Sequence, residues 1–136
     1  MDIQQTKRLL HAARESLQHS YSPYSGYPVG AAVLTENGRI FTGTNIENSS
    51  YSLTICAERV AIFKAASEGA RRIVAVAVIC ASGNECMPCG ACRQVISEFS
   101  ADTQIAVEDS NGVPKVIPLT DLLPQAFGAK DLEKIV

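Results

Sequence analysis

The run Ile73–Ala81 (Ile-Val-Ala-Val-Ala-Val-Ile-Cys-Ala) is the longest apolar stretch in this chain of 136 residues. Its length and its β-branched residues are typical of a strand that is buried on both faces, whereas a membrane span needs about 20 apolar residues. Strands of this kind occur in sheets that helices cover on both sides. The segment therefore favours a layered α/β fold and predicts no membrane anchor.

Hydrophobic periodicity and turn residues divide the rest of the chain into further elements. We expect a helix at 4–19, strands at 29–35 and 39–44, a helix at 54–68, the strand at 73–81, a helix beginning at Pro88, strands at 103–108 and 113–119, and a helical turn ending at 122–124. The last dozen residues are expected to be helical or frayed. The order strand, helix, strand, helix, strand implies right-handed crossovers and some parallel pairing. The prediction is one α/β domain at 1–136, with three α/β/α layers and a mixed five-stranded sheet.

Composition excludes several classes of protein. Apolar residues make up 46% and charged residues 19%, which is typical of a globular chain rather than a disordered one. The net charge of -2 argues against a nonspecific nucleic-acid binder, which would carry a basic face. The N-terminus lacks the basic and apolar regions of a secretory signal, so we expect a cytoplasmic protein.

Five cysteines in a chain expected to be cytoplasmic are not best explained by disulfides. The number is odd, and three of them lie within Cys86–Cys92. Cys80, on the apolar strand, is expected to be a small buried side chain. His11 and His19 lie far from the cysteines in sequence and are not expected to bind metal. Metal binding or redox chemistry at the clustered cysteines is the first hypothesis.

Two short segments, 29 residues apart, carry the chemistry: Cys56-Ala57-Glu58 and Pro88-Cys89-Gly90-Ala91-Cys92. Three thiolates can hold Zn²⁺ and leave its fourth tetrahedral position open, which is typical of a catalytic site. Both segments lie at expected helix starts, where the helix dipole favours thiolate. A carboxylate two residues from a thiol ligand can share its site only beyond the end of the helix. There Glu58 could handle protons instead of binding the metal.

This pattern is the zinc deaminase signature with Cys in place of His as the first ligand. The whole chain resembles the small homotetrameric cytidine deaminases of pyrimidine salvage, from about Thr6 to Phe127. The resemblance extends to segments beyond the zinc motif, in the expected order: Tyr24-Ser25-Gly26-Tyr27-Pro28-Val29-Gly30-Ala31-Ala32, Gly43-Thr44-Asn45-Ile46-Glu47-Asn48 and Cys89-Gly90-Ala91-Cys92-Arg93-Gln94. It implies an enzyme, a hydrolase of carbon–nitrogen bonds, that turns cytidine and 2′-deoxycytidine into uridine and 2′-deoxyuridine plus ammonia.

The resemblance also implies roles for individual residues. Cys56, Cys89 and Cys92 would bind one Zn²⁺ per subunit. A zinc-bound water would attack carbon 4 of cytosine. Glu58 would move a proton from that water to the ring nitrogen and then to the leaving ammonia. Arg59 and Gln94 match positions beside the thiolates, where Arg59 could donate charge-assisted hydrogen bonds to sulfur.

Substrate contacts follow from the same resemblance. Asn45 and Glu47 correspond to the pair that holds the ribose 3′-hydroxyl. Tyr27 occupies a position near the base where the family often has Phe, and the backbone at Ala57 would bind the base edge. Phe127 resembles an aromatic residue that reaches the site of a neighbouring subunit, so the expected partners are a small nucleoside and further copies of the chain. No nucleic acid and no membrane are expected.

Some alternatives remain open from the residues alone. Cys86 could compete with Cys89 as a ligand or close the site as a fourth cysteine, which would make it structural and inert. Its position before Pro88 and the presence of Glu58 argue against both roles. The chain could instead deaminate another aminopyrimidine compound or act on RNA or DNA bases. It could also be a zinc-stabilised binding module, or a redox protein that uses Cys86 and Cys89.

Overall fold

The computed structural model describes residues 1–132. The five strands form one sheet in the order β2-β1-β3-β4-β5, in which β3 and β4 are parallel and the other neighbours antiparallel. The strands are β1 (Val29–Thr35), β2 (Ile40–Thr44), β3 (Ile73–Cys80), β4 (Gln104–Glu108) and β5 (Pro114–Pro118). The helices are α1 (Ile3–Ser16), α2 (Ala57–Ser67), α3 (Gly90–Phe99) and α4 (Leu119–Leu122), with 3₁₀ turns at Leu17–His19, Tyr51–Leu53 and Ala129–Asp131.

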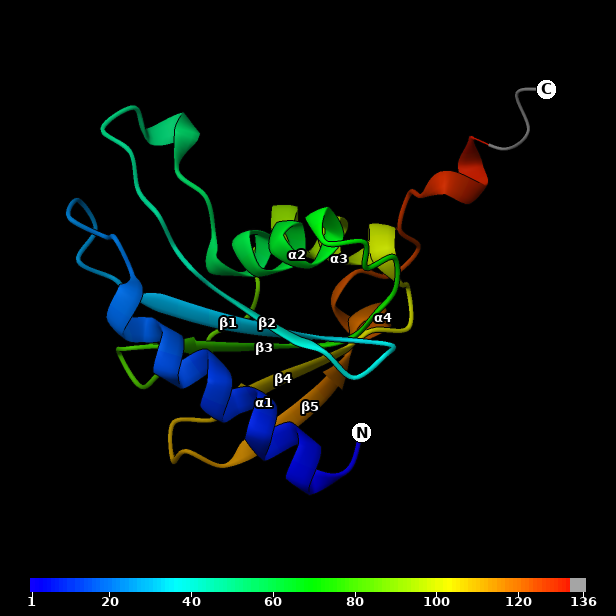
Figure 1. The fold of residues 1–136 in the computed structure, drawn as a ribbon, viewed down its shortest axis with the longest axis horizontal. Helices are drawn as coiled ribbons and strands as arrows, with labels where there is room; N and C mark the ends of the chain where they lie inside the picture. The colour runs from blue at the N-terminus through cyan, green and yellow to red at the C-terminus, as the bar shows by residue number, and fades with distance from the viewer. Residues whose placement is uncertain (133–136) are drawn as a thin grey trace.

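Helices cover both faces of the sheet (Figure 1). Helix α1 packs on one face, with Leu9, Leu10 and Ala13 in one apolar cluster, and α2 and α3 lie on the other, over a second cluster. The predicted three layers and the mixed five-stranded sheet are confirmed. Within residues 1–132, no helix combines the length and the apolar character that crossing a membrane requires.

Local sequence explains the first half of the fold. Asp2 and Gln5 form a capping box that begins α1. The two strands predicted at 29–35 and 39–44 are present and form a hairpin, with β1 and β2 paired antiparallel. Gly38 takes φ +85°, a conformation that an Asn-Gly turn supplies at low cost.

Gly43 allows α2 to lie unusually close to the sheet. A Cβ atom at this position of β2 would come within 2.5 Å of the Ala57 carbonyl oxygen and the Ala61 backbone nitrogen. Ala57, Ala61 and Ala65 are fully buried along the same helix, because small side chains suit so close an approach. The approach fixes the position of the first turn of α2 relative to the sheet.

The starts of α2 and α3 correct two predicted boundaries. Helix α2 begins at Ala57 rather than Thr54, and α3 begins at Gly90 rather than Pro88. The residues before them, Cys56 and Cys89, have extended backbones (ψ 152° and 168°) and occupy the N-cap positions. Pro88 therefore lies outside α3, because the extended Cys89 stands between it and the first helical residue.

Candidate metal centre

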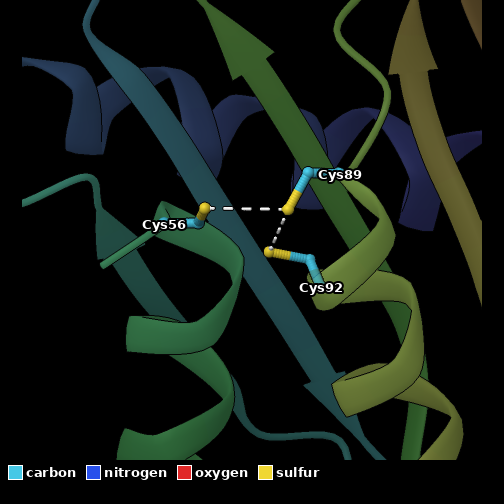
Figure 2. A group of neighbouring side chains, drawn as sticks. All are labelled: Cys56, Cys89 and Cys92. Atoms are coloured by element: carbon cyan, nitrogen blue, oxygen red, sulfur yellow. Dashed lines mark hydrogen bonds between the residues drawn. The ribbon is translucent and has the colours of Figure 1, made fainter. Parts of the chain in front are cut away.

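Three cysteine side chains converge where α2 and α3 begin (Figure 2). Cys56 and Cys89 are the N-caps of the two helices, and Cys92 lies in the first turn of α3. The Cys89 sulfur is 3.8 Å from the Cys56 sulfur and 3.5 Å from the Cys92 sulfur. All three sulfur atoms lie within 4.8 Å of one another. The fold thus brings the thiols of two segments that are distant in sequence into one compact cluster.

The cluster fits a zinc ion. Tetrahedral zinc with bonds of about 2.3 Å to sulfur holds its ligands about 3.8 Å apart, close to the two distances observed. Neither N-cap cysteine uses its side chain to cap its helix, so both thiols are free to face the centre. Among the described residues, the cluster comprises Cys56, Cys89 and Cys92, and Cys86 is not part of it. Three ligands leave room for a fourth, exchangeable one.

Charge near the sulfur atoms is balanced by the protein itself. The Arg59 guanidinium donates a hydrogen bond of 3.2 Å to the Cys56 sulfur. Hydrogen bonds from Cys92 and from Arg59 lower the pKa of Cys56 to about 5, and the interaction with Cys56 raises the pKa of Arg59 in turn. The positive ends of α2 and α3 act in the same direction. Cys56 is therefore favoured as a thiolate, whereas its hydrogen bond with Cys92 raises the pKa of Cys92.

Among residues 1–132, Glu58 is the one buried carboxyl group, and it lies beside the cluster. Glu58 is only 4% exposed, and it lines the same pocket as Cys56 and Cys89. Burial raises the pKa of Glu58 to about 6, because desolvation disfavours the charged form. A carboxyl group with a pKa near neutrality can both accept and release a proton under working conditions.

A hollow of about 390 Å³ opens over the cluster. It is lined by Tyr27, Val29, Asn45, Thr54, Ile55, Cys56, Ala57, Glu58, Glu85, Cys86, Met87 and Cys89. Three of the expected substrate contacts, Tyr27, Asn45 and Ala57, are thus brought to one pocket with the cysteines. Its mixture of apolar walls and a few polar groups is typical of a small-molecule site.

The side chain of Asn45 already makes most of its possible hydrogen bonds within the protein. Its side-chain oxygen accepts hydrogen bonds from the Ser20 hydroxyl at 2.5 Å and the Val29 backbone nitrogen at 3.0 Å. Its amide nitrogen donates to the Tyr27 carbonyl at 2.8 Å. An amide nitrogen has two hydrogens, so one N–H is left for a ligand.

Glu47 lies beside this pocket rather than in it. It lines an adjoining hollow of about 330 Å³, which shares Thr54 with the first. One carboxylate oxygen accepts hydrogen bonds from the Tyr24 and Ser25 backbone nitrogens, at 2.9 and 3.1 Å, and the other accepts one from the Ser25 hydroxyl. These donors, the Ser25 hydroxyl first, hold the pKa of Glu47 below its ordinary value. The carboxylate is therefore charged and oriented.

Two predicted site residues lie outside the pocket of their own chain. Phe127 is 62% exposed and lines a hollow formed by α4 and the residues that follow it. The Gln94 side chain donates a hydrogen bond of 2.9 Å to the Phe127 carbonyl. Contact between Gln94 and the thiolates therefore stays a prediction, and the structure ties this residue to the C-terminal segment instead.

Sequence reasoning missed the residues that hold the polar contacts in place. The sequence assigns no role to Ser20 or Ser25, yet each donates to one of the two residues expected to hold the ribose, Asn45 and Glu47, more than 20 positions away. Glu85 and Met87 also line the pocket. The unusual density of serine and tyrosine at 20–27 was the available signal, but such a segment is equally typical of an ordinary loop.

Comparison with known proteins places these features in a family. Residues 3–108 match the family model described as the cytidine and deoxycytidylate deaminase zinc-binding region. The chain is 46% identical to a cytidine deaminase of Halalkalibacterium halodurans, over 91% of this chain and 95% of the relative. It is 44% identical to a cytidine deaminase of Sporosarcina psychrophila, over 97% and 96% of the two chains. The crystal structure of cytidine deaminase from Burkholderia pseudomallei superposes with a TM-score of 0.84 at 39% identity, covering 93% of this chain and all of that one (100%).

Proposed function

Since the chain belongs to the cytidine and deoxycytidylate deaminase family, we propose that it converts both cytidine and 2′-deoxycytidine, releasing ammonia and serving pyrimidine salvage. The protein is a cytidine deaminase-type hydrolase of carbon–nitrogen bonds, and we propose residues 1–136 as one catalytic domain. The observation that carries the proposal is the meeting of three thiols and one buried carboxyl group at one pocket.

Cys56, Cys89 and Cys92 would hold one zinc ion per subunit. Zinc bound by three protein ligands acts as a Lewis acid and lowers the pKa of a water molecule at its remaining position. Arg59 donates to the Cys56 sulfur and so offsets part of the negative charge that three thiolates bring to the site.

Glu58 is the proposed proton carrier. Its carboxylate takes a proton from the water that attacks carbon 4 of cytosine and passes it to the ring nitrogen. It then carries a second proton to the departing ammonia. Burial supports this role, because it raises the pKa of Glu58 to about 6. A group whose pKa lies near the working pH can both accept and donate a proton.

The remaining pocket residues bind the nucleoside. The Tyr27 ring lines the pocket and would lie against the base, and the backbone at Ala57 would meet the base edge. The free N–H of Asn45 and the charged Glu47 would hold the ribose 3′-hydroxyl, which both donates and accepts hydrogen bonds. Since these contacts spare the 2′ position, both ribo- and deoxyribonucleosides are proposed substrates.

A second copy of the chain would complete the pocket. Phe127 is exposed and is not among the residues lining the pocket of its own chain. Tyr51, which lines the adjoining hollow with Glu47, is 73% exposed. Large apolar side chains left exposed in one chain are available to contact another. We propose a homotetramer in which Phe127 of one subunit reaches the pocket of another, and in which the Gln94 side chain supports Phe127 by donating a hydrogen bond to its backbone carbonyl.

The test is a turnover assay paired with metal analysis. Purified protein should contain about one zinc per chain. It should lower the ultraviolet absorbance of both cytidine and 2′-deoxycytidine as their amino groups are lost. Protein that holds zinc and converts neither nucleoside would overturn the proposal. Full activity in a monomer would overturn the shared pocket alone.

A further inference from the structure

Two chain segments of the pocket wall meet at the ends of β1 and β3. Tyr27 belongs to the segment that enters β1 and Cys86 to the segment that leaves β3, and both line the pocket. Where the segments meet, the Ala81 backbone nitrogen donates a hydrogen bond of 3.0 Å to the Pro28 carbonyl. One residue further along each segment, the Tyr27 hydroxyl oxygen lies 3.3 Å from the Ser82 hydroxyl oxygen. The proposed reaction gives this side-chain contact no task.

The surroundings of Ser82 decide which hydroxyl donates. The Cys80 sulfur donates its one hydrogen to the Asn84 carbonyl oxygen, at 3.3 Å. The Ser82 hydroxyl lies 3.2 Å from the same sulfur and donates its own hydrogen there. The Ser82 oxygen accepts from the Asn84 backbone nitrogen at 3.3 Å, and its second lone pair is left for the Tyr27 hydroxyl. Tyr27 is therefore the donor, and the turn after β3 holds its acceptor in place.

The Tyr27 ring is only partly held by packing. The residue is 43% exposed, although it lines the pocket. Its backbone nitrogen donates to the Ser25 hydroxyl at 3.0 Å, and its carbonyl accepts from the Asn45 amide at 2.8 Å. These bonds fix the backbone but leave the ring free to rotate about its side-chain bonds. The hydrogen bond to Ser82 restrains that rotation from the far end of the ring.

We propose that Ser82 is a positioning residue for nucleoside binding, because it accepts the Tyr27 hydrogen bond and so holds the ring in the orientation that meets the base. The inference rests on the proposed function, in which the Tyr27 ring lies against the base. A ring that is already ordered loses less conformational entropy when a ligand packs against it. Ser82 is not among the residues that line the pocket, so its effect on the nucleoside passes through Tyr27. A phenylalanine in place of Tyr27 could not make this bond.

The experiment is a double-mutant cycle on the zinc-loaded protein. kcat and KM for cytidine are measured for the wild type, Tyr27→Phe, Ser82→Ala and the double variant. In each single variant we expect KM to rise about threefold with kcat unchanged, because the bond orders the ring for substrate and transition state alike. The double variant should also rise about threefold rather than about ninefold, since both changes remove the same bond.

Two further variants separate this role from a general effect on the turn. Ser82→Thr keeps a hydroxyl at an exposed position and should return KM to the wild-type value. Tyr21→Phe removes the hydroxyl of a tyrosine that is 56% exposed and lines neither hollow of the proposed site. It should change neither constant. Circular dichroism and zinc content should match the wild type in every variant.

A second measurement detects the contact without turnover. The chain has four tyrosines, so protein with carbon-13 in its tyrosine rings gives few nuclear magnetic resonance signals, and Tyr27→Phe identifies the signal of Tyr27. Ser82→Ala should shift this signal and leave that of Tyr21 in place. Titration with uridine should give a Kd about threefold higher in Ser82→Ala than in the wild type.

Other outcomes would overturn the proposal. A wild-type KM in Ser82→Ala would remove the positioning role and leave the proposed function intact. A rise of about ninefold in the double variant would show that Ser82 acts independently of Tyr27. A fall in kcat that Ser82→Thr does not restore would show a structural role for the turn. Wild-type protein that neither converts cytidine nor binds uridine would overturn the proposed function, and the positioning role with it, even if the Tyr27 signal shifts.

Discussion

The two sides of the pocket are built by different forces. The cysteine corner, made of Cys56, Cys89 and Cys92, is set by two helices that pack in the apolar core, α2 from its first residue, Ala57, and α3 through Ile96. The opposite side, which we call the loop side (residues 20–28), is held by hydrogen bonds from its serines and backbone to Asn45 and Glu47. Helix packing positions the groups that do chemistry, and polar contacts position the groups that bind.

This difference has consequences for how each side responds to change. Buried helix packing tolerates almost no displacement, because protein interiors are as dense as organic crystals. Exposed hydrogen bonds exchange with water at a modest cost in free energy. Changes at the cysteine corner should therefore alter kcat or folding, and changes at the loop side should alter KM.

Glu58→Gln should give the largest effect. Glutamine has nearly the same shape but cannot carry a proton, so kcat on cytidine should fall by about 10²–10⁴-fold. Zinc content and the circular dichroism spectrum should match the wild type, since the side chain is not among the three thiols. A variant that keeps a tenth or more of wild-type kcat would show that another group moves the proton.

Gly43→Ala tests whether α2 depends on its close approach to β2. The added Cβ would come within 2.5 Å of backbone atoms at Ala57 and Ala61, which cannot move aside as a side chain could. The free energy of unfolding should fall by about 1–3 kcal/mol, measured by urea denaturation. Zinc affinity should fall with it, because Cys56 precedes the displaced turn.

The matched control for this change is Gly90→Ala. Gly90 is the first residue of α3, and a Cβ there would meet no atom within 4 Å. Its stability should not decrease, because alanine is the better helix former. Equal losses in the two variants would contradict the packing argument.

Glu47→Gln should separate binding from chemistry on the loop side. The amide keeps an oxygen for the Tyr24 and Ser25 backbone donors but loses the negative charge. We expect KM for cytidine to rise about tenfold with kcat nearly unchanged, the pattern of a lost contact that serves substrate and transition state equally. Glu98→Gln, on the exposed surface of α3, should change neither constant. A fall in kcat alone would place Glu47 in the chemistry instead.

Asp102→Asn should give the smallest effect and serves as a reference far from the pocket. The Ser100 hydroxyl and the Arg72 guanidinium hold the pKa of Asp102 below its ordinary value. A carboxyl whose pKa is lowered by folding stabilises the protein above its unfolded pKa and loses this contribution as pH falls through the folded value. The wild type should therefore have a slightly higher Tm than the variant at pH 7. The gap should close in acid, and a gap that widens there would contradict the assignment.

Sequence predicted the layers and the metal cluster well, because both depend on local pattern. The apolar run at 73–81 and the Asn-Gly turn determine a strand and a hairpin whatever surrounds them, and the cysteine spacing matched a known chemistry. The contacts of Ser20 and Ser25 were not predictable, because their partners lie more than 20 residues away and meet them only after folding.

The first residues of the helices were also hard to predict from local sequence. Pro88 has a strong preference for the first helical position, yet Cys89 is extended and α3 begins at Gly90, two residues after Pro88. This extended backbone places the Cys89 thiol 3.8 Å from the Cys56 sulfur, a contact between residues that lie too far apart in sequence for a local pattern to predict.

X-ray absorption at the zinc edge tests the central claim most directly, because it counts the atoms around the metal in the intact protein. We predict three sulfur atoms and one lighter atom, and the same count in Cys86→Ala. Four sulfur atoms in the wild type that fall to three in Cys86→Ala would show a closed structural site. That result would contradict a pocket built around three cysteines and Glu58.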